Sequence, residues 1–162
     1  MLVSYATPVP THYARCFLRS TLINLHDKGN YVANDLMQVA TGSIHLDDQA
    51  VRVVAEVCSV YPERNEALIN AGVLALTRET CKFPGYASVI GHADWYVQNM
   101  SQEHGILSCR DQNGRVEESF AVGDKLLMYV SHSCITAAAY EHYFVVDADD
   151  VVTEVWRPWK WW

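Results

Sequence analysis

The sequence lacks the features that mark membrane-spanning, nucleic-acid-binding and secreted proteins. No apolar run in its 162 residues approaches the roughly 20 residues that are needed to span a bilayer. Basic residues are scarce: 12 Lys and Arg stand against 19 Asp and Glu, which gives a net charge of −7. This charge argues against nucleic acid and anionic membranes as partners. The first residues also lack the basic-then-apolar plan of a signal peptide.

Cysteine is present in a number and spacing that do not suit a disulfide framework. There are five cysteines, an odd number at irregular intervals. A reducing, cytoplasmic setting is therefore expected. Half of the residues are hydrophobic and 19% are charged, which is the composition of a globular domain with its own core.

Short segments with strand character and regular turns dominate the chain. Residues 51–60 are rich in β-branched side chains, and their alternation predicts that Val51, Val53, Ala55 and Val57 face a core. Further strands are predicted at 2–5, 96–100, 105–108, 126–130, 143–146 and 151–156, with a short helix over 36–40 and a hairpin turn at Asn113-Gly114. This pattern is typical of a β-barrel or sandwich.

A histidine and a cysteine two residues apart follow the predicted strand 126–130. On a strand, residues i and i+2 point to the same face, so His132 and Cys134 are predicted to converge. An imidazole and a thiolate together suit a zinc ion. A core cysteine beside a polar histidine is the alternative interpretation of the same pair.

Three other segments place polar groups near predicted turns. The Ala6-Thr7 turn offers backbone N–H groups and a hydroxyl that can hold a phosphate, although an ordinary strand end has the same pattern. Tyr31 can donate to a phosphate or simply pack on the surface. Glu103 beside His104 can orient a metal-binding histidine, or both can belong to a solvated turn.

The order of these segments resembles the D-serine dehydratase and D-threonine aldolase family. Residues 67–79 are similar to the family's segment that contains Asp-Ala-Gly, with Asn70 where Asp is usual. Residues 101–105 are similar to its Ser-Glu-Glu-His-Gly segment, and residues 132–134 to its metal motif. The resemblance covers nearly the whole chain.

This resemblance implies a fold in two parts. The family joins an alanine-racemase-type TIM barrel, which binds pyridoxal 5′-phosphate (PLP), to a C-terminal β domain. The chain is accordingly expected to be α+β and mostly β. Residues 1–42 are expected to be a remnant of the end of the PLP-binding barrel. Residues 43–162 are expected to form the antiparallel β-barrel or sandwich domain.

The resemblance also implies cofactors and site residues. His132 and Cys134 are the implied zinc ligands. Ala6, Thr7 and Tyr31 are implied to lie at the PLP site. The aldolases are expected to carry Asp where this chain has Cys134, so the cysteine favours the dehydratase branch.

The implied activity is that of a lyase acting on a small D-amino acid. It is the zinc-assisted, PLP-dependent β-elimination of D-serine to pyruvate and ammonia, by a homodimer in the full-length form. D-threonine aldolase or D-3-hydroxyaspartate dehydratase activity is the alternative within the family. A catalytically inactive zinc-binding or interaction domain is the alternative outside it.

The lysine that binds PLP as a Schiff base is missing from this sequence. The lysines are Lys28, Lys82, Lys125 and Lys160, and none stands in the matching motif. Members of the family are more than twice as long, and their lysine lies in the N-terminal barrel. The chain is therefore expected to be a C-terminal fragment, such as a truncated gene model, without catalytic activity of its own.

Overall fold

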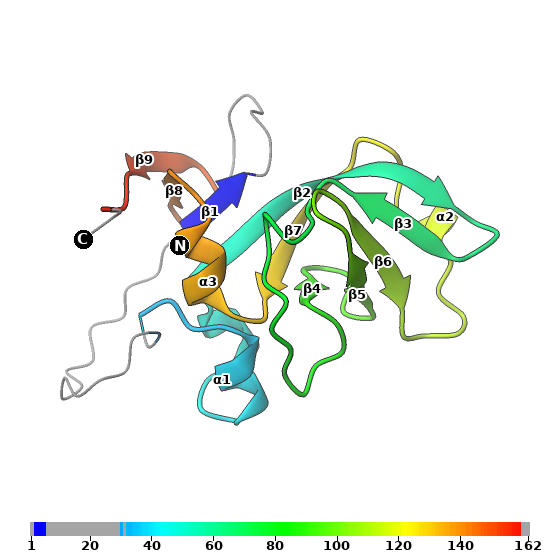
Figure 1. Cartoon of the computed structure of the whole chain (residues 1–162), viewed down its shortest axis with the longest axis horizontal. Helices are drawn as coiled ribbons and strands as arrows, with labels where there is room; N and C mark the ends of the chain where they lie inside the picture. The colour runs from blue at the N-terminus through cyan, green and yellow to red at the C-terminus, as the bar shows by residue number, and fades with distance from the viewer. Residues whose placement is uncertain (1, 6–29, 31, 160–162) are drawn as a thin grey trace.

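The computed structural model describes residues 2–5, 30 and 32–159, and these residues form a mostly β structure (Figure 1). The strands are β1 (Leu2–Tyr5), β2 (Val51–Tyr61), β3 (Glu66–Ile69), β4 (Ala87–Val89), β5 (Trp95–Met100), β6 (Gly105–Cys109), β7 (Lys125–Val130), β8 (Tyr143–Val146) and β9 (Val152–Trp156). The helices are α1 (Leu36–Ala40), the 3₁₀ turn η1 (Leu46–Asp48), α2 (Val116–Ser119) and α3 (Ser133–Ala138).

Six strands close into an antiparallel barrel. Their order is β3-β6-β5-β4-β7-β2, and an additional pairing of β3 with β2 closes the ring. Each of these neighbours pairs antiparallel to the next. The prediction of an antiparallel β-barrel or sandwich is therefore confirmed, and the structure is the barrel of these two. Closure leaves none of the six strands with an open edge along the ring.

The long strand β2 connects the barrel to a smaller group of strands. It spans 11 residues, pairs with β7 and β3 inside the barrel, and pairs in parallel with β1. Strand β1 pairs in turn with β8, and β8 with β9, so that these three strands extend the sheet beside the barrel (Figure 1). A bulge between Val57 and Ser59 marks where β2 changes its register with β3.

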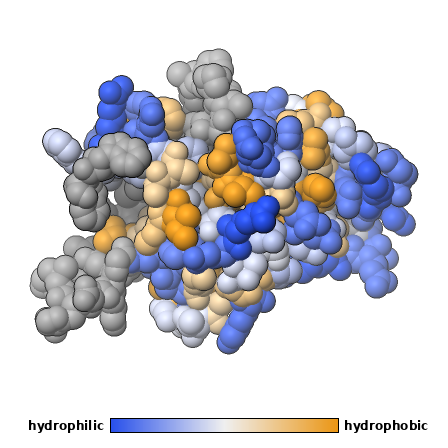
Figure 2. Space-filling view, viewed as in Figure 1, coloured by the Kyte–Doolittle hydropathy of each residue, from blue (hydrophilic) through white to orange (hydrophobic). Residues whose placement is uncertain are grey.

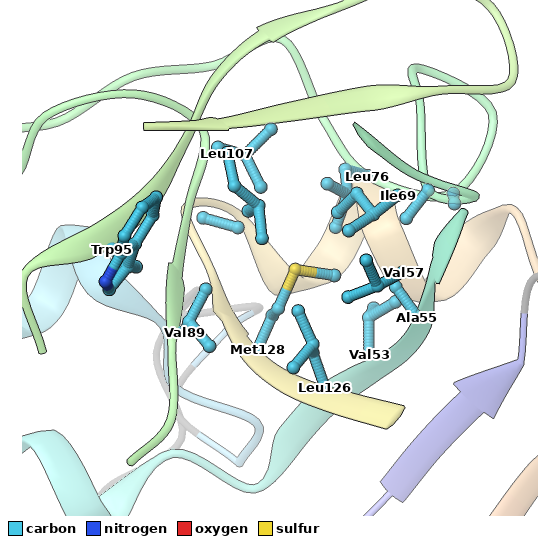
Figure 3. Packing of buried hydrophobic residues seen from close by; sticks show 14 of the residues in the cluster. Val53, Ala55, Val57, Ile69, Leu76, Val89, Trp95, Leu107, Leu126 and Met128 are labelled. Carbon is cyan, nitrogen blue, oxygen red and sulfur yellow. The ribbon is translucent and has the colours of Figure 1, made fainter. Parts of the chain in front are cut away.

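The barrel interior is the main hydrophobic core, and the alternation of β2 fills one side of it. Val51, Val53, Ala55 and Val57 are at most 2% exposed, which confirms the predicted inward face. Figure 3 shows Met128 of β7 in the middle of the cluster, with side chains from several strands around it. Val54 points to the other side of β2, where it packs with Val146 in a second, smaller cluster.

The prediction of a hairpin at Asn113-Gly114 is wrong. The turn itself forms, because the N–H of Gly114 donates to the carbonyl of Asp111 at 3.1 Å. Asn65, in the β2–β3 turn, then holds the outgoing chain: its side chain donates to the carbonyl of Gly114 and accepts from the N–H of Val116, both at 2.8 Å. The chain consequently enters α2, and the next strand, β7, pairs with β2 and β4 instead of β6.

The helices of the described part are all short, and none is long and apolar enough to cross a membrane. Figure 2 shows one face of the molecule, on which hydrophobic side chains form small separate groups between hydrophilic ones. The end that carries the β2–β3 hairpin is mainly hydrophilic on this face.

Candidate metal centre at the start of helix α3

The segment after β7 leaves the sheet one residue before the predicted metal motif. Val130 is the last residue of β7 in the ladder with β4, and both the N–H and the hydroxyl of Ser131 donate to the carbonyl of Tyr86. His132 is still extended, with φ −139° and ψ 103°, and acts as the N-cap residue of α3. Cys134 lies in the first turn of α3.

The prediction that a strand presents His132 and Cys134 on one face is therefore wrong in its geometry. The N–H of Ser133 is not available to a β ladder, because it donates to a side-chain oxygen of Asp35 at 2.9 Å. The chain turns into a helix at that point. The two side chains make contact with different partners, His132 with Glu79 and Cys134 with Asn30.

The imidazole of His132 is oriented by a carboxylate. Its Nδ1 donates to an Oε atom of Glu79, and the His132 side chain is only 25% exposed. With Nδ1–H engaged, the lone pair of a neutral ring lies on Nε2, which is the arrangement that metal-binding histidines have. Glu79 itself is held locally, because its N–H donates to the hydroxyl of the buried Thr77 at 3.1 Å.

The thiol of Cys134 is exposed to solvent on one side and faces a polar group on the other. Its Sγ donates to Oδ1 of Asn30 at 3.4 Å. Partial burial raises the pKa of Cys134, and the nearby carboxylate of Asp35 raises it further. The side chain is therefore a thiol near neutral pH, and a metal ion would have to displace its proton.

A buried carboxylate lies behind the motif. Asp35 is 0% exposed and is the N-cap residue of α1, where its Oδ1 accepts the N–H of Met37 at 3.0 Å. Its Oδ2 accepts the N–H of Ser133 and a side-chain N–H of Asn30. The hydroxyl of Ser133 donates to the amide oxygen of the same Asn30.

The two segments that resemble family motifs meet in space. The N–H groups of Val73 and Leu74 donate to the carbonyls of Ser101 and Gln102, at 3.0 and 3.2 Å. Gly72 makes this approach possible, since a Cβ atom there would lie 2.5 Å from the Gln102 carbonyl oxygen.

Tyr140, two residues beyond α3, is also hydrogen-bonded to this segment. Its buried hydroxyl donates to the carbonyl of Ala75 at 2.8 Å, and burial raises the pKa of Tyr140, so this hydroxyl is a neutral donor. The segment that ends at Glu79 is thus fixed at the β5–β6 turn and at the end of α3. This explains how Glu79 comes to lie against His132.

The other residues that the sequence singled out are Ala6, Thr7, Tyr31, Glu103 and His104. Ala6, Thr7 and Tyr31 lie outside the described residues. Glu103 and His104 are exposed, and Glu103 accepts a hydrogen bond from Gln102 at 3.2 Å, as expected of a solvated turn.

The carboxylate that orients the histidine is Glu79, which the sequence analysis did not single out. Its only signal was its position at the end of a motif-like segment. Within residues 2–5, 30 and 32–159, no group of three or more His, Cys, Asp and Glu side chains is arranged to hold a metal ion.

Comparisons with known proteins assign the family. The family described as "Putative serine dehydratase domain" matches residues 50–146. D-serine dehydratase of Schizosaccharomyces pombe is 44% identical over 140 residues, which cover 83% of this chain and 33% of that protein. The chain therefore spans about a third of the length of this relative.

Solved structures show the same fold. D-threo-3-hydroxyaspartate dehydratase from Delftia sp. HT23 superposes with a TM-score of 0.70 at 25% identity, over 82% of this chain and 38% of that one. One structure of a variant of this enzyme is described as its metal-free form. An alanine racemase-like protein from Idiomarina loihiensis also has a TM-score of 0.70, at 27% identity, over 82% of this chain and 38% of that one. Because the family match extends over more than half of its residues, the chain belongs to the D-serine dehydratase family and has the mostly β fold of its alanine-racemase-like relatives.

Proposed function

We propose that this chain is the metal-binding β domain of a zinc- and PLP-dependent D-serine dehydratase. In this proposal, residues 43–162 are the β domain, and residues 1–42 come from the end of the PLP-binding barrel. The substrate of the whole enzyme is a small D-amino acid, and its full-length form is a homodimer. The identity with the D-serine dehydratase of Schizosaccharomyces pombe supports this substrate class.

The observation that carries the proposal is the contact between Nδ1 of His132 and Glu79. A metal-binding histidine commonly donates its other ring N–H to a carboxylate, which fixes the tautomer and raises the basicity of the ligating nitrogen. Here the carboxylate comes from a segment that is itself held by Gly72 and Tyr140. A histidine that merely filled space at a helix N-terminus would not need such support.

The donor set of the site fits zinc. An imidazole nitrogen and a thiolate sulfur are typical zinc ligands, and Cys134 supplies the softer of the two. A bound zinc ion would supply Lewis-acid stabilisation for the hydroxyl group that leaves D-serine. His132, whose ring is oriented by Glu79, and Cys134 would hold that ion, and Cys134 would give up its thiol proton on binding.

The proposal does not use any described lysine as the Schiff-base site for PLP. Lys125 pairs with Glu56 on the barrel surface, and Lys82 is exposed. The proposal accordingly assigns the Schiff-base lysine to the barrel of a longer protein, where PLP would act as the electron sink. Ala6, Thr7 and Tyr31 are proposed to reach the cofactor from this chain. Without the barrel, the chain is proposed to be inactive.

Two alternatives remain as separate proposals. The D-threo-3-hydroxyaspartate dehydratase of Delftia sp. is 28% identical over 141 residues, so a 3-hydroxyaspartate substrate has support of its own. A zinc-binding domain without catalytic activity is the other. Assay of a full-length form with D-serine, D-threonine and D-threo-3-hydroxyaspartate separates all three. A cytoplasmic location is also proposed, supported by the free state of Cys58, Cys81, Cys109 and Cys134.

The proposal is tested by the zinc content of the purified chain. Wild type is expected to bind about one zinc ion per chain, because one imidazole and one thiolate define one site. His132→Ala and Cys134→Ala are expected to lose most of it. Cys58→Ala is the matched control, since Cys58 is another exposed thiol whose pKa is raised by burial. Full zinc content in Cys134→Ala would overturn the proposal.

A further inference from the structure

We propose that Asp35 is a positioning residue for the metal ligands, and that it acts through the backbone of Ser133. This inference rests on the proposed function of His132 and Cys134 as zinc ligands. Asp35 does not belong to the motif and stands 97 or more residues before it in the chain. The hydrogen bond from the N–H of Ser133 to Oδ2 of Asp35 brings the two segments together.

Both oxygens of the Asp35 carboxylate accept hydrogen bonds from other groups of the protein. Asp35 is 0% exposed, and a buried carboxylate is costly unless its oxygens are hydrogen-bonded. Oδ1 accepts the N–H of Met37, which closes the first turn of α1, and Oδ2 accepts from Ser133 and Asn30. The two oxygens of Asp35 thus bind different elements: Oδ1 accepts from the first turn of α1, and Oδ2 accepts from the start of α3.

Ser133, whose N–H Asp35 binds, lies between the two ligands in the chain. Ser133 follows His132 and precedes Cys134, so fixing its N–H fixes the backbone from which both side chains project. Glu79 restrains His132 at its ring, whereas no carboxylate contacts the sulfur of Cys134 in the described hydrogen bonds. The position of the sulfur is set instead by the backbone of the first turn of α3.

Asn30 extends this arrangement to the thiol. It donates to Oδ2 of Asp35, and its amide oxygen accepts from the hydroxyl of Ser133 and from Sγ of Cys134. The carboxylate therefore orients the amide that faces the sulfur. Loss of Asp35 would release the N–H of Ser133 and remove one of the two acceptors that hold the Asn30 side chain, the other being Oε1 of Gln38 at 3.2 Å. The restraint on the backbone that carries both His132 and Cys134 would then be weaker.

The test measures cobalt(II) binding to the purified chain, with variants that break the same hydrogen bond from either side. Asp35→Ser keeps a good N-cap for α1 but cannot reach Ser133. Ser133→Pro removes the N–H at the first helical position, where proline is tolerated, and Ser133→Ala is its control because it keeps that N–H. Asp147→Ser is the control for loss of a carboxylate, since Oδ1 of Asp147 also accepts two backbone N–H groups, but those of Asp149 and Val151 in the turn between β8 and β9.

Supporting residues around a metal site typically change affinity by 10- to 100-fold. Asp35→Ser and Ser133→Pro are expected to weaken cobalt binding by about this factor and to reduce the thiolate-to-cobalt charge-transfer absorption. Ser133→Ala and Asp147→Ser should bind at least several-fold more tightly than these two variants. The charge-transfer band is the decisive reading, because a merely structural effect lowers the melting temperature without changing the spectrum of the cobalt that is bound.

Two failures are distinguishable. If wild type itself binds no cobalt through His132 and Cys134, the metal site of the proposed function is absent, and this inference falls with it. If wild type binds, and both Asp35→Ser and Ser133→Pro match their controls in affinity and spectrum, only the role of Asp35 is overturned. If Asp35→Ser does not fold, Ser133→Pro against Ser133→Ala decides the question.

Discussion

Replacing Gly72 by alanine is predicted to destabilise the domain, because Gly72 allows a close approach between residues 67–79 and the β5–β6 turn. A Cβ atom there would lie 2.5 Å from the carbonyl oxygen of Gln102 and 2.6 Å from the backbone nitrogen of His104. Both neighbours are backbone atoms of the β5–β6 turn, so no side chain can rotate away. The turn and the segment that follows Gly72 would have to separate.

The expected cost follows from what the separation breaks. Overpacking of this kind costs about 1–3 kcal/mol. The hydrogen bonds from Val73 to Ser101 and from Leu74 to Gln102 would be weakened as well, at about 1 kcal/mol net for each. Alanine also lowers the conformational entropy of the unfolded chain, which offsets about 0.4–1 kcal/mol of this loss. Gly72→Ala should thus lower the free energy of unfolding by about 2–5 kcal/mol, measured by urea denaturation followed by circular dichroism.

Two further glycines provide the controls. A Cβ on Gly105 would lie 2.5 Å from the carbonyl of Ala71, across the same contact, whereas one on Gly114 would meet the side-chain sulfur of Cys109. Gly105→Ala should therefore be costly, and the double variant with Gly72→Ala should cost at least about 0.5 kcal/mol less than the sum of the two. Gly114→Ala should cost less than about 1 kcal/mol, since the sulfur can rotate away. A Gly72→Ala protein within about 0.5 kcal/mol of wild type would refute the reasoning.

Four other outcomes are expected. Tyr140→Phe should lower the free energy of unfolding by about 1–3 kcal/mol, because the buried carbonyl of Ala75 loses its donor. Met128→Ala should cost about 2–5 kcal/mol in the same urea titration, since Met128 is fully buried in the barrel. Glu79→Gln should weaken zinc binding by about 10- to 100-fold in a chelator competition, and unchanged affinity would remove Glu79 from the site. The purified chain alone should form no pyruvate from D-serine, and pyruvate production would contradict the assignment of the Schiff-base lysine to a separate barrel.

The barrel was predictable from the sequence because its strands carry their own signal. Val51, Val53, Ala55 and Val57 alternate with residues of the opposite face, and a register shift by one would turn all four away from the barrel core. The turn at Asn113-Gly114 carried an equally strong local signal, and yet no hairpin forms. Asn65, 49 residues away from Gly114, redirects that turn into a helix, and such a contact has no trace in a local pattern.

The candidate site was predictable only in its residue types. His132 and Cys134 stood out by chemistry and resemblance, but the period of a strand did not apply to them. Asp35 competes for the N–H of Ser133 and turns the chain into α3. Glu79 could not be identified from a local pattern either, because it is 53 residues away from His132 in the chain. Their contact depends on the fold of the segment between them.

The central claim is that His132 and Cys134 bind one metal ion together. The most direct measurement is an anomalous difference map at the zinc absorption edge, from crystals of the chain grown with zinc. One peak is expected about 2.0–2.1 Å from a ring nitrogen of His132 and about 2.3 Å from Sγ of Cys134. A map with no peak between these two side chains, or with zinc on either residue alone, would contradict it.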